Sequence, residues 1–158
     1  MASPSFIQAL TAVLSPESRI LIDESSAEFK ASMNRWTNFN LKVPSAIVQP
    51  ASEDDVVTTV KELVSTSIPF TPSSGGHSCF SSIAKDGVII DLSRFTGVEV
   101  DEAQSLATIK GGTLMKELQT VLHPYKHFTG TCAFHEIDSL KPNLLTTVQL
   151  SVVETRSG

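Results

Sequence analysis

The chain has 158 residues, of which 41% are hydrophobic and 18% charged, a composition typical of a globular domain with a core. Its net charge of −5, with no basic stripe, argues against a nucleic-acid partner, and no apolar run is long enough to span a membrane. The N-terminus lacks a basic stretch before an apolar one, so we expect a soluble protein without a signal peptide. Two cysteines, Cys79 and Cys132, are too few for a disulfide framework, and their pairing stays open.

The first 50 residues predict one helix and two short strands. Ser3 followed by Pro4 is typical of a helix start, and apolar residues then recur on one face as far as Leu14. The runs 19–22 and 45–48 are short, apolar and bounded by polar residues or proline, which favours strands.

The segment between these two strands is polar but contains three aromatic residues. Phe29, Trp36 and Phe39 punctuate residues 23–40. We expect residues 34–40 to form an ordered loop held by its aromatic side chains, with Trp36 buried.

Residues 52–90 predict a helix and two further strands. Ser52 and Asp55 have the spacing of a capping box, and apolar residues follow at helical spacing up to Val64. Residues 68–71 begin the next strand, and 88–90 predict a strand buried on both faces. A strand–helix–strand unit of this kind favours parallel pairing of its two strands through a right-handed crossover.

Residues 98–125 predict two strands and a second helix. The strands cover 98–101 and 106–110, and a polar turn joins them. Thr113 is expected to cap the helix after a Gly-Gly bend, and His123-Pro124 to end it. The expected apolar face of this helix consists of Leu114, Leu118, Val121 and Leu122.

The most unusual stretch is 71–82, TPSSGGHSCFSS, where Gly75 and Gly76 stand between small hydroxyl residues and His77 follows. With so little side-chain bulk, the backbone N–H groups can converge on an anion such as a pyrophosphate. Glycine allows the positive φ values that such a nest needs. The alternative is an ordinary Gly/Ser turn between two strands.

Six segments stand in an order that points to a family: RWTNFN, PSAIVQPASEDDVVTTV, IPFTPSSGGHS, GVIIDLSRFTGVEVD, ATIKGGTLMKEL and GTC. From about Trp36 to Phe134, the chain resembles the flavin-binding domain of the FAD-linked oxidases, of the p-cresol methylhydroxylase or vanillyl-alcohol oxidase type. It is most similar to the berberine-bridge-enzyme-like branch. The resemblance implies an α+β fold, the p-cresol-methylhydroxylase-type FAD-binding domain, incomplete at its C-terminal end.

The resemblance implies FAD as the cofactor. The residues that match its binding segments are Ser73, Ser74, Gly75, Gly76, His77, Ser78, Gly130, Thr131 and Cys132. His77 matches a histidine that bonds to the flavin 8α carbon, and Cys132 matches a cysteine that bonds to flavin C6 in bicovalent members. Imidazole and thiolate are nucleophiles able to add to an electron-poor ring. The alternatives are a hydrogen-bonding loop histidine and a small buried cysteine.

The chain departs from the family pattern at two places. Ser73 stands where many relatives carry an arginine, which leaves anion attraction to N–H groups and hydroxyls. Family members continue after the GTC segment with a second glycine-rich run, whereas residues 135–158 have no glycine before Gly158. We therefore expect a lead-in over 1–35, a partial FAD-binding domain over 36–134 and a divergent tail over 135–158.

Two functions follow from the resemblance. One is an FAD-linked oxidoreductase that passes a hydride from a small organic substrate to the flavin and then to oxygen. Its catalytic residues stay unassigned, and a substrate would bind only in a complete form or with a partner chain. The other is a truncated, non-catalytic remnant that binds flavin weakly or not at all.

Other nucleotide and metal motifs fit poorly. His123, His127, Cys132 and His135 lie close in sequence, but their spacing matches no common zinc module, so we expect no metal site. There is no G-x-G-x-x-G fingerprint, and no Gly-Lys-Ser/Thr follows the glycines.

Overall fold

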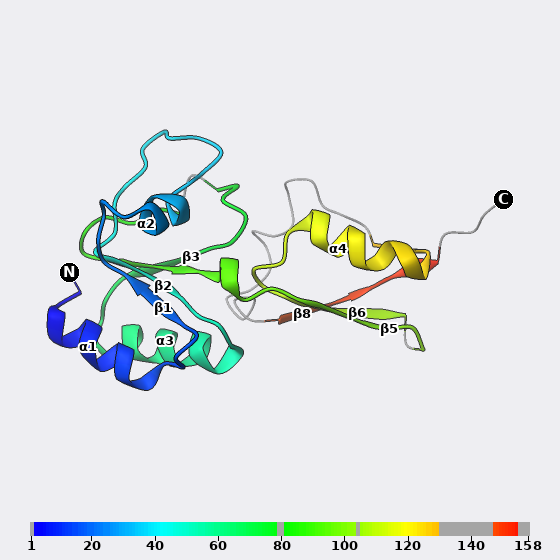
Figure 1. Ribbon diagram of the computed structural model, residues 1–158, viewed down its shortest axis with the longest axis horizontal. Coiled ribbons are helices and arrows are strands. Elements are labelled where there is room, and N and C mark those ends of the chain that lie inside the picture. Colours follow the sequence, from blue (N-terminus) through cyan, green and yellow to red (C-terminus); the bar gives the residue numbers. More distant parts are fainter. Residues whose placement is uncertain (1, 79–80, 104, 130–146, 155–158) are drawn as a thin grey trace. The chain divides into compact units, whose positions relative to one another are not determined.

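The computed structural model describes residues 2–78, 81–103, 105–129 and 147–154, which divide into two compact units, Met1–Phe95 and Thr96–Gly158 (Figure 1). Cys79, Gly130, Thr131 and Cys132 lie outside the described residues. Within the described residues, none of the helices has the length and apolar character needed to cross a membrane.

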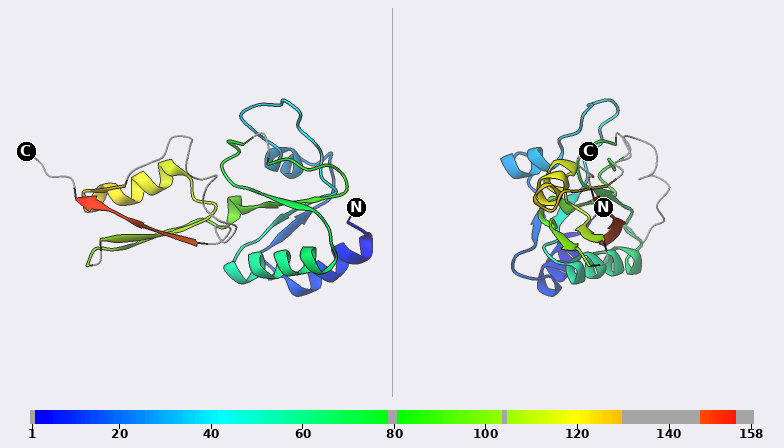
Figure 2. Two further views of the ribbon diagram at one scale, coloured as in Figure 1. Left: turned by 180° about the vertical axis from the view of Figure 1, so that it is seen from behind. Right: turned by 90° about the vertical axis from the view of Figure 1, so that its right-hand side faces the viewer.

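The first unit is a four-stranded sheet with helices on both faces. Its elements are α1 (Pro4–Val13), β1 (Arg19–Leu21), α2 (Ala27–Ser32), β2 (Ala46–Gln49), α3 (Glu53–Ser65), β3 (Phe70–Ser73), β4 (Val88–Asp91) and the 3-10 turn η1 (Leu92–Arg94). The strand order is β1-β2-β4-β3, with β1 antiparallel to β2 and the other three strands parallel. Figures 1 and 2 show α1 and α3 on one face of the sheet and α2 on the other.

The predicted parallel direction of β2 and β3 is confirmed, but the prediction that they pair directly with each other is wrong. Ile89 of β4 is the register partner of both Ile47 in β2 and Thr71 in β3, so β4 lies between them. All four residues of β4 are buried. A strand that is apolar on both faces is most stable in the centre of a sheet, which explains why it separates the two strands that precede it.

The predicted burial of Trp36 is also wrong. The side chains of Trp36 and Phe39 are 73% and 79% exposed, while Phe29 is only 2% exposed. Phe29 belongs to α2, a helix that was not predicted and that begins at the N-cap Ser26. Phe29 packs against Ile47 of the sheet. The core on this face is therefore filled by side chains of α2 rather than by Trp36.

The predicted starts of α1 and α3 are confirmed. Ser3 accepts a hydrogen bond from Phe6 N at 3.1 Å. Ser52 Oγ accepts from Asp55 N at 3.1 Å, and Asp55 Oδ2 accepts from Ser52 N at 3.1 Å, which completes a capping box. Leu63 of α3 is fully buried, as expected for its inner face.

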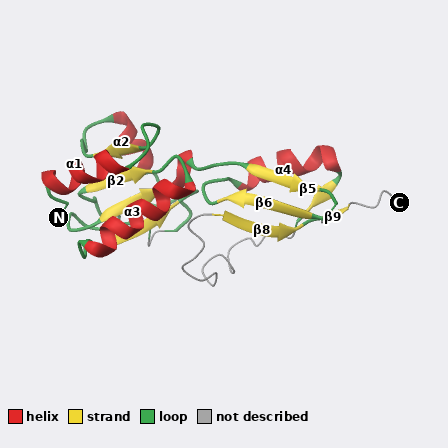
Figure 3. Ribbon diagram, turned by 90° about the horizontal axis from the view of Figure 1, so that it is seen from below, coloured by secondary structure: helices red, strands yellow, loops and turns green. Residues whose placement is uncertain are grey.

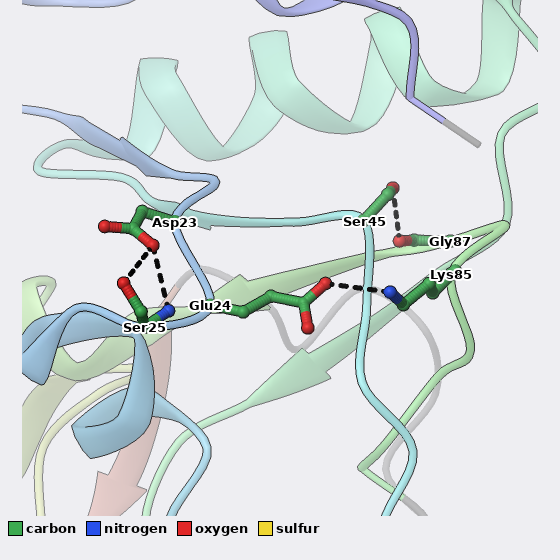
Figure 4. A network of polar contacts seen from close by, with 6 residues as sticks. All are labelled: Asp23, Glu24, Ser25, Ser45, Lys85 and Gly87. Carbon is green, nitrogen blue, oxygen red and sulfur yellow. Dashed lines mark hydrogen bonds and ion pairs between the residues drawn. The ribbon is translucent and has the colours of Figure 1, made fainter.

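The chain entering β2 is tied to the chain entering β4. Ser45 donates to Gly87 O from both its N–H, at 2.9 Å, and its Oγ, at 2.8 Å. A Cβ on Gly87 would lie 2.8 Å from Pro69 O, just before β3, so the close approach of Gly87 to that backbone requires glycine here. An ion pair between Lys85 and Glu24, at 3.2 Å, joins the same region to the loop after β1 (Figure 4).

The second unit is an antiparallel sheet with one helix. Its elements are β5 (Val98–Asp101), β6 (Leu106–Lys110), α4 (Met115–Leu122), η2 (His123–Tyr125), β7 (His127–Phe128), β8 (Thr147–Ser151) and β9 (Val153–Glu154). The order β5-β6-β8 forms one sheet, and β7 pairs with β9. α4 covers one face of β5-β6-β8 (Figure 3), where Leu118 and Leu122 pack on Ala107 and Val152.

The start of α4 differs from the prediction. Its N-cap is Leu114, which has no capping oxygen and is 46% exposed, so it lies off the apolar face. Thr113 instead exchanges two hydrogen bonds with Gly97, accepting from its N at 2.9 Å and donating to its O at 3.1 Å. The threonine hydroxyl is thus used to hold the start of β5 rather than the helix.

Candidate functional site

Three polar residues end the three parallel strands of the first unit at one edge of the sheet. They are Gln49 of β2, Asp91 of β4 and Ser73 of β3. Asp91 is 3% exposed, and its carboxylate accepts from Gln49 Nε2 at 2.8 Å and from Ser93 N at 3.0 Å. Gln49 Nε2 also donates to Ser32 Oγ, at 2.9 Å, so this edge carries a hydrogen-bonded buried network.

The glycine loop leaves the sheet at this same edge. The loop is shorter than the predicted stretch 71–82, because Thr71–Ser73 belong to β3, where Ser73 is buried. Ser74, Gly75 and His77 are exposed, while Gly76 and Ser78 are partly buried. In open sheets of parallel strands, ligands bind outside the carboxyl ends of the strands, so the loop lies where a ligand is expected.

One residue of the loop has a left-handed backbone conformation of the kind found in anion nests. Gly76 has a φ of +71°, a backbone conformation that residues other than glycine rarely adopt. Alternating left- and right-handed residues point successive N–H groups to one side. No acidic residue occurs in 71–82, so no carboxylate of this stretch would repel a bound anion.

The segment Arg35–Trp36 is hydrogen-bonded to this loop. Trp36 N donates to Gly76 O at 3.1 Å, and Arg35 donates from Nε and Nη2 to Ser81 O at 3.1 and 2.9 Å. Burial lowers the pKa of Arg35, and the negative charge of Asp91 raises it. An arginine remains charged at neutral pH under such opposing effects.

Neither the second expected flavin contact nor the alternative zinc cluster lies wholly within the described residues. Gly130, Thr131, Cys132 and His135 lie outside the described residues. His127 Nδ1 lies 2.6 Å from Tyr125 O, in the turn before β7. Among the described residues there is no group of three or more histidine, cysteine or acidic side chains placed to hold a metal ion.

A family described as FAD binding domain matches residues 44–138. The chain belongs to this family. The match covers β2 through β7, including the glycine loop, and it confirms the family expected from the sequence. FAD is therefore the cofactor of the family to which the loop belongs.

Known relatives agree with this assignment. The FAD-linked oxidoreductase hasG of Aspergillus fumigatus is 38% identical over 99 residues, 62% of this chain and 21% of the relative. The crystal structure of 6-hydroxy-D-nicotine oxidase from Arthrobacter nicotinovorans is similar with a TM-score of 0.67 and 24% identity, over 74% of this chain and 26% of that one. The structure of BBE-like 1 from Physcomitrella patens is similar with a TM-score of 0.67 and 22% identity, over 80% of this chain and 28% of that one.

These similarities confirm the expected fold class. The α+β fold is that of the p-cresol-methylhydroxylase-type FAD-binding domain. The chain spans about a fifth of the length of the curated relatives it matches and about a quarter of the solved structures.

Three residues of the site were not singled out from the sequence. Arg35, Gln49 and Asp91 act through hydrogen bonds between segments that are far apart in the chain. The signal that could have found two of them is a polar residue directly after an apolar strand, because the carboxyl ends of parallel strands meet at one edge. Arg35 has no comparable local signal.

Proposed function

We propose that this chain binds FAD through the loop Ser74–Ser78, which holds the pyrophosphate. The observation that carries the proposal is the loop's place: it is exposed, it contains Gly76 at φ +71°, and it follows β3 at the carboxyl edge of the parallel strands. Ser73 contributes through its backbone in β3, because its side chain is buried. Gly130, Thr131 and Cys132 are proposed as a second contact with the flavin. The FAD-binding part is proposed to span 36–134, with a lead-in before it and a divergent tail after it.

Two covalent links to the cofactor are part of the proposal. The exposed imidazole of His77 bonds to the flavin 8α carbon, and Cys132 is a second anchor at C6. In the first link an N–C bond replaces one N–H and one C–H bond, and in the second an S–C bond replaces one S–H and one C–H bond. The two protons and two electrons that each link releases reduce one oxygen molecule to hydrogen peroxide, so oxygen is the required oxidant.

The proposed reaction class, in a complete form or together with a partner chain, is oxidation of a small organic substrate by hydride transfer to FAD, followed by reoxidation by oxygen. The cofactor supplies this chemistry, and the protein supplies binding and orientation. The second candidate is a truncated, non-catalytic remnant that binds flavin weakly or not at all. It is supported by residues 135–158, which lack the glycine-rich run that family members carry after the GTC segment.

The first test concerns the glycine loop. We expect Gly76→Val to abolish FAD uptake in a fluorescence titration, because a side chain here would block the approach of the pyrophosphate to the backbone. The new Cβ would also lie 2.9 Å from Asn34 O, so the loop itself would shift. Gly97→Val is the matched control: Gly97 also has a positive φ but belongs to the second unit, and this variant should still bind FAD. Wild-type affinity in Gly76→Val would refute the nest.

The second test concerns the covalent link. FAD-loaded protein is precipitated with acid and viewed for flavin fluorescence on a denaturing gel. We expect a fluorescent band in the wild type and in His123→Ala, an exposed histidine outside the loop, and a weaker or absent band in His77→Ala. Release of all flavin by the wild type would remove the covalent link and leave the binding proposal standing.

A further inference from the structure

The segment Arg35–Trp36 contacts two carbonyl oxygens of the glycine loop. Trp36 N bonds to Gly76 O, and the two donors of the Arg35 fork bond to Ser81 O. Neither contact uses an N–H group of the loop. Through these contacts the segment constrains which way the peptide groups of the loop face, and it uses acceptors of the loop in doing so.

The orientation of one donor follows from peptide geometry. The described backbone has no cis peptide bond, and in a planar trans peptide the C=O of one residue and the N–H of the next point in opposite directions. Because Gly76 O faces Trp36, the N–H of His77 faces away from the Arg35–Trp36 segment. The hydrogen bond between Trp36 N and Gly76 O thus orients the His77 N–H away from the Arg35–Trp36 segment.

Arg35 is itself held in place. Its Nη1 donates to Ser32 O at 2.9 Å and to Asn34 O at 2.8 Å. A Cβ built on Gly76 would lie 3.8 Å from Arg35 Cδ, so the arginine stem passes next to the turn of the loop. The guanidinium therefore lies close behind a loop that has no lysine or arginine of its own in 71–82.

We propose that Arg35 is a positioning residue for pyrophosphate binding. Together with Trp36 it holds the glycine loop in the conformation in which the His77 N–H faces the bound anion. Its charge also offsets the absence of a cation at Ser73. This inference rests on the proposed function, because it assigns a role within the same site.

The test is a calorimetric titration of the 158-residue chain with ADP and with FAD. We expect Arg35→Gln to raise the Kd for ADP about ten-fold or more, since charge-assisted hydrogen bonds are lost. Arg35→Lys keeps the charge but not the fork, so it should recover only part of the affinity. The matched control is Arg19→Gln: Arg19 is exposed on β1, the edge strand opposite β3, and its loss should leave the Kd unchanged.

Amide hydrogen exchange of the wild type supplies a readout that does not depend on a variant folding. We expect the Trp36 amide to be protected without ligand, and the His77 amide to be slowed only when ADP binds. An unprotected Trp36 amide, or a His77 amide unaffected by bound ADP, would overturn the inference. An unchanged Kd in Arg35→Gln would overturn it while leaving the proposed function intact. A wild type that binds neither ADP nor FAD would overturn both.

Discussion

At the scale of single residues, Asp55 joins two parts of the first unit. Its carboxylate accepts hydrogen bonds from Ser15 N and Ser15 Oγ, both at 2.8 Å, and from Ser52 N and Oγ at 3.1 and 2.6 Å. Burial raises the pKa of Asp55, but these hydrogen bonds outweigh it and lower the pKa to about 2. The end of α1 is thereby fastened to the start of α3 through one carboxylate.

The lowered pKa of Asp55 leads us to expect that the free energy of unfolding depends on pH. The folded-state pKa of about 2 lies below the ordinary value of 3.8. The contribution is therefore fully present above about pH 4 and is lost as the pH falls towards 2, which amounts to about 2 kcal/mol. Urea unfolding of the wild type should show this loss, and Asp55→Asn should lack it. Asp54→Asn, at an exposed neighbour, should behave as the wild type. Parallel curves for the wild type and Asp55→Asn would contradict the assignment.

At the scale of elements, the two longer helices after β2 begin differently. α3 has a complete capping box from Ser52 and Asp55. α4 has only half of one, because Glu117 Oε2 accepts from Leu114 N at 2.8 Å but Leu114 has no oxygen to offer in return. The sequence predicted the first helix start correctly because the capping signal is local. It misplaced the second because the hydroxyl of Thr113 is used by Gly97, a residue 16 positions earlier.

A serine at position 114 would supply the side-chain oxygen that the capping box of α4 lacks. Leu114→Ser gives the sequence Ser-x-x-Glu at the start of α4, and we expect the second unit to gain about 1 kcal/mol in the free energy of unfolding. Leu114 is 46% exposed, so part of its apolar burial is lost, and comparison with Leu114→Ala separates this loss from the gain in capping. Amide exchange in α4 and urea unfolding measure the effect. Leu114→Ala, which offers no hydroxyl, should not stabilise; equal gains in both variants would show that removal of the leucine, not capping, is the cause.

At the scale of the whole molecule, the sequence predicted the family, most strands and the place of the glycine loop. Apolar strands, caps and paired glycines are local signals, so they can be found without the fold. The order of β2, β4 and β3 could not be found in this way, because it depends on which strand buries both faces. The contact of Arg35 with Ser81, 46 positions later, exists only once that order is set.

The activity of the chain by itself is the remaining prediction at this scale. Hydride transfer needs the donor carbon held about 3.5 Å from the accepting atom and a group that takes the proton. Residues 135–158 resemble neither the second glycine-rich run nor a substrate domain. We therefore expect the FAD-loaded 158-residue chain to produce no substrate-dependent hydrogen peroxide in an oxygen-electrode assay with sugars, alcohols and aromatic alkaloids. Peroxide that depends on substrate and disappears in His77→Ala would show that the chain is an active oxidase.

Trp36 gives the chain a built-in optical probe. It is the only tryptophan, its side chain is largely exposed, and its backbone N–H is bonded to Gly76 O in the glycine loop. Indole emission overlaps the absorption of oxidised flavin, so a flavin close to this residue quenches the emission by energy transfer. Every change in tryptophan emission therefore reports on one known position beside the loop. The arrival of the cofactor can be timed in unlabelled protein, with no second tryptophan to subtract.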